Sequence, residues 1–381
     1  MNYTLMHKNF PVVLIEIDSE TGVVSKVGRS FAIERIPVGV SVRDGLPNRG
    51  DLNDWWQGRS IPASRQNIRQ ALKILGVSST DELLTQCYGL SLCDQYWVNP
   101  VRNPLDWNEI NFFDNPFSED VGNALFGNAP MGNLNLISPD NTSDGWLQKK
   151  WQIINGKHCL IKGGSDPFWQ QSINEVMAAI VMRRLGILHV DYTLIWVDGY
   201  PYSVCENFVT CDTELVSAFY IHNTQRIADT HGLFKHYIEC CELLGIPDIR
   251  QRLDQMLIVD YLIANTDRHM NNFGALRDVE TLKWLYVAPL YDNGSSFWYN
   301  HAVVREDVAV KCQPFCETHE QQVGLVSDFS WINLSALTGV DDEINELLMA
   351  SPWIDATRHK AICTSLIKRI KKLGRLIKST M

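Results

Sequence analysis

The ten residues Asn265–Gly274, NTDRHMNNFG, place a carboxylate, an imidazole and several carboxamides in one short segment directly after an apolar run. A turn uses Asp or Asn to cap its own backbone, but it does not need a histidine as well. Phosphoryl transfer needs a carboxylate beside the acceptor hydroxyl and a carboxamide or carboxylate on Mg²⁺. Asp267 and Asn272, five residues apart, can supply both groups from one loop. The segment therefore predicts a catalytic loop.

A further carboxylate follows 25 residues after Asp267, in the run VAPLYDNGSSF. Asp292 stands at the predicted end of a strand and just before Gly294, where a kinase places its second metal ligand. An Asp-Asn-Gly turn explains Asp292 by itself equally well. The order of the whole set along the chain is what favours a magnesium site.

Lys162 and Glu175 are the third feature of this set. Lys162 ends the β-branched strand CLIK, and Glu175 lies thirteen residues later in the next predicted helix. Kinases use a strand lysine paired with a helix glutamate to hold the α- and β-phosphates of a nucleotide. An ordinary salt bridge would also explain the pair if it stood alone.

The elements that must position these residues follow in the order strand, strand, helix, strand, strand, and then a mainly helical half. WQIINGKHCLIKGG and VDYTLIWVDGYPYSVCENFV are predicted hairpins with turns at Asn-Gly and Asp-Gly. SINEVMAAIVMRRLGI between them has the apolar spacing of a helix. The helix over DIRQRLDQMLIVDYLIA should end close to Asn265, because Asp267 and Asn272 face different partners only from an irregular loop.

Before the first of these strands lies ISPDNTSDGWLQKK, a loop of small residues that includes Ser143 and Gly145. Such a loop can cover phosphates with its backbone N–H groups. It matches neither GxGxxG nor GxxxxGK[ST], so a plain turn remains the alternative.

The first 125 residues carry no motif that we can name. FPVVLIEID and VVSKVG predict a hairpin, PASRQNIRQALKILGV a helix capped by Ser64, and STDELLTQCYGL a helix capped by Ser79 or Thr80. The second helix has no Lys or Arg, which argues against a DNA-reading pair of helices. Residues 95–140 are rich in Asn, Pro, Asp and Gly and predict a long irregular connection.

Composition describes a globular chain of 381 residues with 45% hydrophobic residues and a formal net charge of −10. That charge argues against nonspecific nucleic-acid binding by the whole surface. No apolar run is long enough to span a membrane, and the N-terminus lacks the pattern of a signal peptide, so we expect a cytoplasmic protein. Ten cysteines lie mostly in apolar segments, which predicts buried thiols. Cys312, Cys316 and His319 could bind zinc, but their loose spacing and the lack of an obvious second Cys or His pair favour the structural role.

The C-terminal segment 356–381 has eight Lys and Arg and no acidic residue, whereas the remainder carries 26 basic against 44 acidic residues. Its apolar residues follow helical spacing. A terminal helix packed on an acidic body is the interpretation we prefer. A helix that touches nucleic acid, a membrane surface or an acidic partner is the alternative.

From about Trp146 to Trp331 the chain resembles the HipA-like serine/threonine kinase family. NTDRHMNNFG resembles the inverted catalytic loop of that family, LYDNGSS its metal-binding turn, and CLIKGGSDPFWQQSINEVMAAIVMRRLGI its lysine strand and following helix. The resemblance implies an α+β, two-lobed protein-kinase-like fold. Its strand-rich N-lobe would span residues 126–209 and its helical C-lobe residues 210–381, after an additional N-terminal α/β segment at residues 1–125.

The resemblance also assigns roles to single residues. Asp267 would be the catalytic base, Asn272 and Asp292 the Mg²⁺ ligands, and Lys162 with Glu175 the pair that holds the phosphates of ATP. His269 would support the catalytic loop, Ser143 and Gly145 would lie in the phosphate loop, and the backbone from Glu206 to Phe208 would contact adenine. A serine of that loop can be autophosphorylated in the family, and the candidates here are Thr142 and Ser143.

The leading function is therefore an ATP- and Mg²⁺-dependent kinase that phosphorylates Ser or Thr of an unidentified protein substrate. Family members often act as toxins restrained by a small DNA-binding antitoxin, so such a partner is an expectation here. Two alternatives stay open: a non-catalytic nucleotide-binding regulator in a toxin-antitoxin or repressor assembly, and a kinase acting on a lipid or small molecule. Direct nucleic-acid binding is expected only through the basic C-terminal helix.

Overall fold

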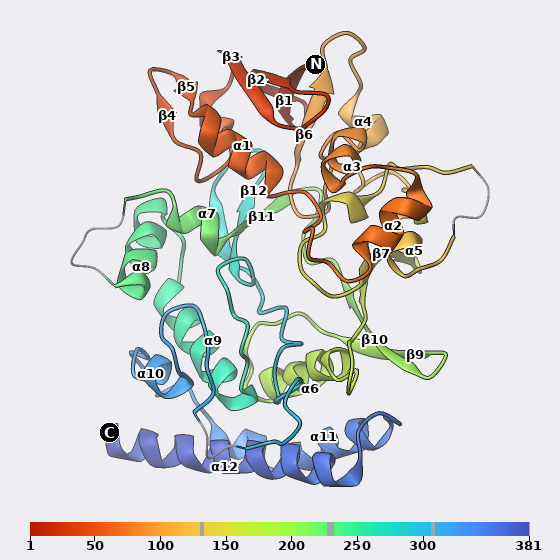
Figure 1. The fold of residues 1–381 in the computed structure, drawn as a ribbon. Coiled ribbons are helices and arrows are strands. Elements are labelled where there is room, and N and C mark those ends of the chain that lie inside the picture. Colours follow the sequence, from red (N-terminus) through yellow and green to blue (C-terminus); the bar gives the residue numbers. More distant parts are fainter. Residues whose placement is uncertain (130–132, 227–231, 306–308, 381) are drawn as a thin grey trace.

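The fold is mixed α/β, with its strands in small antiparallel sheets and most of its helical residues in the second half of the chain (Figure 1). Residues 1–129, 133–226, 232–305 and 309–380 are described in a computed structural model of the chain. The N-terminal sheet lies at one end of the molecule and the C-terminal helix at the other (Figure 1).

The N-terminal sheet contains the predicted hairpin and two strands that the sequence analysis missed. Its strands, in the spatial order β3-β2-β1-β6, are β1 (Asn2–His7), β2 (Phe10–Ile17), β3 (Val24–Ser30) and β6 (Tyr96–Pro100). Side chains of β1 alternate between buried and more exposed positions, as in a strand with one face on the core. Helix α1 (Arg49–Gln57) adds Trp55 and Trp56 to that core.

Two predictions for the rest of the N-terminal segment were wrong. Helix α2 (Ile68–Leu75) is not capped by Ser64; it starts after Asn67, which has φ +62°, because residues 62–68 form two turns instead. The region 95–140 is not one irregular connection. It holds β6 and the short elements α4 (Trp107–Ile110), α5 (Asp120–Leu125) and η2 (Pro139–Thr142).

The remaining small elements of this segment are η1 (Ile33–Arg35), β4 (Val42–Arg43), β5 (Leu46–Pro47) and α3 (Thr80–Gln86). Ser79 caps α3, as predicted: its side chain accepts a hydrogen bond from the backbone N–H of Glu82.

Both hairpins of the central sheet are confirmed. Its strands, in the order β7-β8-β10-β9, are β7 (Lys149–Ile154), β8 (Lys157–Lys162), β9 (Thr193–Val197) and β10 (Tyr200–Glu206). Helix α6 (Gln171–Arg184) packs on β9 and β10 and is buried along most of its length. Because α6 is buried so completely, its Glu175 must have partners inside the protein.

The second half of the chain is mainly helical but also contains a three-stranded sheet, β11-β12-β13, at Thr213–Ser217, Gly274–Asp278 and Trp284–Val287. The helices are α7 (Ala218–His222), α8 (Leu233–Leu244), α9 (Ile249–Ile263), α10 (His319–Val323), η3 (Leu334–Leu337), α11 (Val340–Met349) and α12 (Ala356–Thr380). They share the largest hydrophobic core with α6, so α9 is held rigidly at the centre.

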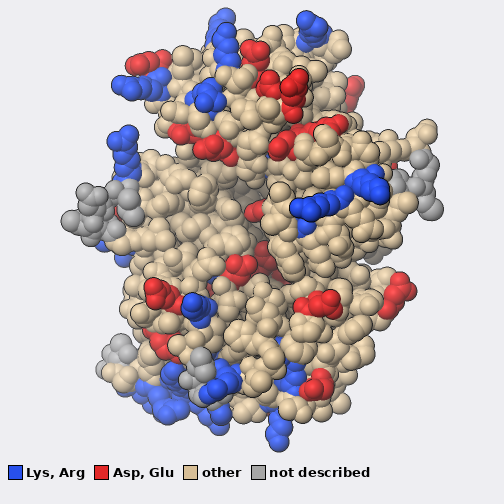
Figure 2. All heavy atoms as spheres, in the orientation of Figure 1, with Lys and Arg blue, Asp and Glu red and all other residues tan. Residues whose placement is uncertain are grey.

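Helix α12 packs on α9 and α11, which fits the preferred interpretation of the C-terminal segment. Two of its basic residues point inward: Arg358 donates to the carbonyl of Trp298 at 2.7 Å, and Arg369 to that of Tyr261 at 2.5 Å. Figure 2 shows other Lys and Arg gathered over α12 at one edge of the molecule. No helix within the described ranges is long and apolar enough to cross a membrane. All ten cysteines are free thiols.

Candidate active site

Helix α9 ends at Ile263, which confirms the prediction that it stops close to Asn265. Ala264 terminates it in the left-handed conformation with φ +53°, and the chain then enters an irregular loop. The loop is anchored by Arg268, whose role the sequence analysis did not identify. The guanidinium is fully buried, forms an ion pair with Asp260 of α9 and donates to the carbonyl oxygens of Asn272 and Tyr291. Arg268 thereby joins the catalytic-loop candidate to the segment that carries Asp292.

Asp267 and Asn272 lie at the two ends of one compact turn. The side-chain nitrogen of Asn272 donates to the backbone carbonyl of Asp267 at 2.9 Å, and this bond leaves the amide oxygen available for another partner. The Asp267 carboxylate is half-buried, and Nε2 of Gln313 lies 3.4 Å from it. Burial, together with the nearby charge of Asp292, raises the pKa of Asp267, whereas His269 acts in the opposite direction. A carboxylate with a raised pKa is a better proton acceptor.

Lys162 connects two carboxylates from separate parts of the chain. Its Nζ lies 3.0 Å from Glu175 on α6 and 2.9 Å from Asp292. The other oxygen of Glu175 accepts from the backbone N–H of Asn293 at 2.8 Å, which fixes the turn behind Asp292. Burial alone would lower the pKa of Lys162, but Asp292 and Glu175 outweigh it and raise that pKa. The lysine therefore stays charged in a buried position.

Asp292 lies beyond a strand rather than at its end, which corrects the prediction. β13 stops at Val287, and Asp292 has φ +57° in the loop that follows. Asp tolerates this left-handed conformation better than most residues. Burial opposes ionisation of the Asp292 carboxyl, but Lys162 and then Lys149 outweigh that effect and lower its pKa. The carboxylate is held as an anion while its side chain remains 32% exposed.

Lys149 is a residue of this site that the sequence analysis missed. It lies directly across from Lys162 in the β7–β8 hairpin, and burial lowers its pKa to about 8. Gly145 has φ +97°, a conformation that strains any larger residue, and a Cβ there would lie 2.6 Å from Nζ of Lys149 and displace the end of the lysine side chain. The Asn155-Gly156 turn sets the register of the hairpin, so the pairing of Lys149 with Lys162 was derivable from the sequence.

The phosphate-loop candidate is held by the N-terminal segment. Arg65 donates to the hydroxyl of Ser143 at 2.7 Å and to the carbonyl of Gly145 at 2.9 Å, and the hydroxyl of Thr142 donates to the carbonyl of Leu90 at 3.0 Å. Ser143 is buried, and its hydroxyl donates to the carbonyl of Asp140. The backbone N–H groups of Ser143 and Gly145 already bond within the loop, to the carbonyl of Asp140 and to the Asp144 carboxylate. Their predicted contacts with phosphate require this loop to change conformation.

The adenine-binding candidates lie at the end of β10. Glu206 is exposed and forms an ion pair with Lys157 at 2.6 Å, so its side chain points away from Lys162 to the surface. The ring of Phe208 packs against Tyr291, with 5.5 Å between the ring centres. His269 is half-buried beside Asp267, and its Nδ1 accepts from the backbone N–H of Asn271 at 3.2 Å, as expected of a residue that supports the loop.

The donor set fits Mg²⁺ in its chemistry. Asn272 offers one amide oxygen and Asp292 a carboxylate with one oxygen 2.9 Å from Lys162, and hard oxygen donors of this kind suit Mg²⁺. Within the described parts of the chain no three His, Cys, Asp or Glu side chains come together as a metal site. A metal here would therefore complete its shell with phosphate oxygens and water, as Mg²⁺ does when it is bound together with a nucleotide.

Comparisons with known proteins identify a family and similar folds. A family model described as the HipA-like C-terminal domain matches residues 142–351. HipA of Shewanella oneidensis MR-1, solved with HipB and operator DNA, has 13% sequence identity and a TM-score of 0.56; the likeness covers 98% of this chain and 97% of HipA. The Helicobacter pylori proinflammatory kinase CtkA has 17% identity and a TM-score of 0.46, over 61% of this chain and 95% of CtkA. At such identities the likeness concerns the fold alone. No curated protein sequence matches the chain significantly.

Proposed function

The chain belongs to the family of HipA-like C-terminal domains, and from that premise we propose that it is an ATP- and Mg²⁺-dependent protein kinase acting on Ser or Thr. In this proposal the central sheet with α6 forms the N-lobe of a kinase and the helical half its C-lobe. The observation that carries the proposal is the bridge from Lys162 to Glu175 and Asp292, because it joins the strand, helix and loop that a kinase needs at its phosphates.

The reaction follows from the positions of the charged groups. Asp267 accepts the proton of the substrate hydroxyl, whose oxygen then bonds to the γ-phosphorus of ATP while the bond to the β–γ bridging oxygen breaks and ADP leaves. Lys162 and Lys149 hold the phosphates from adjacent strands. Mg²⁺, held by Asn272 and Asp292, supplies neutralisation of the phosphate charge when it is bound.

Two groups near the phosphates are charged before the nucleotide arrives, and this supports catalysis by positioning. Lys162 is fixed between its two carboxylates, and Asp292 is kept ionised by the lysines. Preorganised charge stabilises a transition state without further rearrangement. A non-catalytic regulator would not need Asp267 in addition, with a raised pKa and a position beside the same site.

Incubation of the full chain with labelled ATP and Mg²⁺, and of its Asp267→Asn variant in parallel, tests the proposal. The expected result is labelled Ser or Thr in a cell lysate and on the protein itself, found by mass spectrometry, with none from the variant. If no protein is labelled in any sample but the wild type binds ATP tightly, the result would support the non-catalytic regulator. Labelled lipid or small molecules without labelled protein would support the other alternative.

The partner and the location that we propose are those expected from the same family. The HipA neighbour was solved together with HipB and operator DNA, so a small DNA-binding antitoxin is the partner we propose, and a toxin of a toxin-antitoxin system is the proposed biological role. The ten free cysteines fit a reducing compartment, and the cytoplasm is the location we propose. Autophosphorylation at Thr142 or Ser143 would require the loop to leave Arg65 and Leu90.

A further inference from the structure

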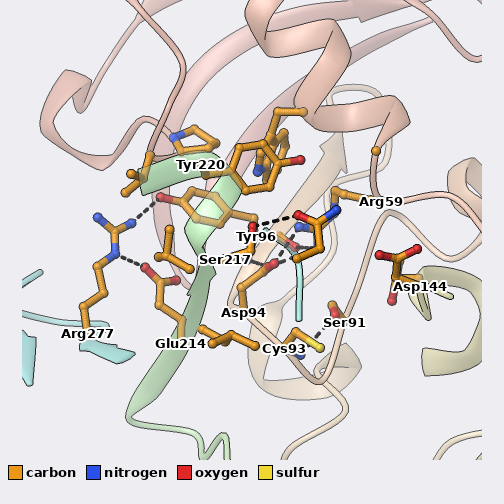
Figure 3. A pocket seen from close by; sticks show the side chains of 18 residues that line it. Arg59, Ser91, Cys93, Asp94, Tyr96, Asp144, Glu214, Ser217, Tyr220 and Arg277 are labelled. Carbon is orange, nitrogen blue, oxygen red and sulfur yellow. Dashed lines mark hydrogen bonds and ion pairs between the residues drawn. The ribbon is translucent and has the colours of Figure 1, made fainter. Parts of the chain in front are cut away.

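A pocket of about 180 Å³ lies between the N-terminal segment and strand β11 (Figure 3). A cavity of about 150 Å³ can hold a ring of the size of benzene, so this volume suits one side chain. Its walls include the rings of Trp55, Tyr96 and Tyr220 and the apolar side chains of Val38 and Val216. The reaction proposed above uses none of these residues.

This pocket adjoins the hollow beside the proposed base. Asp144 and Asn271 line both the pocket and a neighbouring, more open hollow that also contains His269 and Gln313. Gln313 lies 3.4 Å from Asp267, so the open hollow is next to the place where a substrate hydroxyl would react. A chain that presents a hydroxyl to Asp267 can therefore place a neighbouring side chain in the pocket.

The rim of the open hollow favours a peptide as the occupant. Trp146 is 50% exposed and Phe219 is 45% exposed, and both line that hollow. Large exposed rings beside a cleft are typical of surfaces that bind another polypeptide.

The charges in the pocket identify the kind of side chain that it would take. Arg59 pairs with Asp94 at 2.6 Å, and Arg277 pairs with Glu214, so these four charges compensate each other. The remaining charge is the exposed carboxylate of Asp144, for which the described residues offer no ion pair; Figure 3 shows it across the pocket from Glu214 and Arg277.

Arg65 and Lys149 interact electrostatically with Asp144, but other partners hold both of them in place. Arg65 bonds to Ser143 and Gly145, and Lys149 lies next to Asp292 and Lys162, at the proposed phosphates. Figure 2 shows further Asp and Glu side chains around the hollow at the centre of the same face. Aromatic and aliphatic walls with one uncompensated carboxylate match a long side chain that has an apolar stem and a cationic end.

We propose that this pocket is a specificity subsite that receives an arginine or lysine side chain of the protein substrate, close in sequence to the phosphorylated Ser or Thr. The inference rests on the proposed kinase function, and it gives the N-terminal segment a role in choosing the substrate. Aromatic rings of that segment hold the stem, and Asp144 attracts the charged end.

The test compares the sequences around the sites that the full chain phosphorylates in a dephosphorylated cell lysate with ATP and Mg²⁺. For the wild type, Lys and Arg should be enriched at one fixed position relative to the acceptor, by roughly fivefold, the effect of one contact of about 1 kcal/mol between charges in water. Asp144→Asn should remove the enrichment, Asp144→Glu should keep it, and Asp144→Lys should replace it with enrichment of Asp and Glu. The matched control Glu16→Lys, at an exposed position of β2, should leave it unchanged.

Sequence preference is the readout because a variant that is merely slower phosphorylates fewer sites of the same kind. Two synthetic peptides that differ only by Arg or neutral citrulline at the enriched position then give the effect on KM and on kcat, and we expect it in KM. Phosphorylated sites without basic enrichment, or with an enrichment that Asp144→Lys does not change, would overturn the subsite and leave the kinase function standing. No phosphorylated site with the wild type would overturn the kinase function and the subsite together.

Discussion

The side-chain nitrogen of Asn272 donates to the backbone carbonyl of Asp267 at 2.9 Å. This bond closes a turn over the five-residue spacing that is visible in the sequence, and it decides which atom of the amide remains available. Because the nitrogen is used, the oxygen of Asn272 is left as a ligand, while the Asp267 carboxylate stays free to accept a proton. One short loop can thus carry two groups with different chemical roles.

Replacement of Asp267 by Asn should separate nucleotide binding from transfer. The variant keeps the shape of the side chain but loses the proton acceptor, so we expect kcat to fall by about 10²- to 10⁴-fold while ATP affinity is unchanged. Isothermal titration with ATP and a transfer assay on the same preparation measure both. Asp212→Asn, at an exposed position, is the control. A variant with full turnover would exclude Asp267 as the base.

Removal of the Asp292 carboxylate should abolish Mg²⁺-dependent transfer and leave the fold intact. Lys162 keeps its ion pair with Glu175 in Asp292→Asn, so no buried charge loses its only partner, and Asn tolerates the left-handed backbone at this position. We expect a melting temperature close to that of the wild type and no transfer at any Mg²⁺ concentration. Undiminished transfer in this variant would show that Asp292 is not a metal ligand.

Loss of Lys162 should reduce both activity and stability, and a second substitution should distinguish the two effects. Lys162→Met leaves the buried Glu175 without its cation, which typically costs about 3–5 kcal/mol of stability. The double variant Lys162→Met/Glu175→Gln should recover much of that stability in urea unfolding. It should stay about 10²- to 10³-fold less active, because the phosphate contact is still missing. Recovery of activity along with stability would mean that Lys162 has only a structural role.

Lys149 should make ATP binding depend on pH near its pKa of about 8. The charged amine attracts phosphate, so affinity should be highest below pH 8 and fall, by at most about tenfold per pH unit, as pH rises through that value. Lys149→Arg, which stays charged, should bind ATP equally well at pH 7 and pH 9.5, and Lys149→Met should bind weakly at both.

Unfolding at high pH does not account for such a loss of affinity, because the contribution of Lys149 to folding stability increases with pH. The pKa of Lys149 is lowered on folding, so between about 8 and the ordinary value of 10.5 the unfolded chain binds more protons and this group stabilises the fold as pH rises. Titration of ATP across this range, with the melting temperature recorded in the same buffers, tests both signs. If wild type and Lys149→Met bind ATP with the same affinity at every pH, Lys149 lies away from the phosphates.

Arg65 should act on the nucleotide from the N-terminal segment. In Arg65→Ala the loop at Ser143 and Gly145 loses three hydrogen bonds to a buried guanidinium, which hold it in the conformation that keeps its backbone N–H groups from phosphate. We therefore expect KM for ATP to fall about tenfold, the equivalent of about 1.4 kcal/mol. Arg69→Ala, at an exposed position of α2, is the matched control and should change nothing. An unchanged KM in Arg65→Ala would show that the loop is held by its own backbone bonds.

Much of the site could be predicted from the sequence because its key residues lie in short local patterns. The turns at Asn155-Gly156 and Asp198-Gly199 set the hairpins, the apolar spacing set α6, and the polar run after α9 marked the loop of Asp267 and Asn272. The spacing of apolar residues and the residue types of turns depend on neighbours within a few positions, so both can be recognised in the sequence without knowledge of the fold. The family resemblance rested on these same segments.

The tertiary structure alone decided which distant residues meet. Arg268 is one more arginine in the sequence, and only its burial against Asp260 and Tyr291 shows that it ties two loops together. Arg65 lies 78 residues before Ser143, and nothing in their spacing predicts the bond between them. The pocket beside Asp144 likewise needs the N-terminal segment and β11 to pack on each other. Contacts between segments far apart in sequence depend on how whole elements pack, and a local pattern carries no information about that packing.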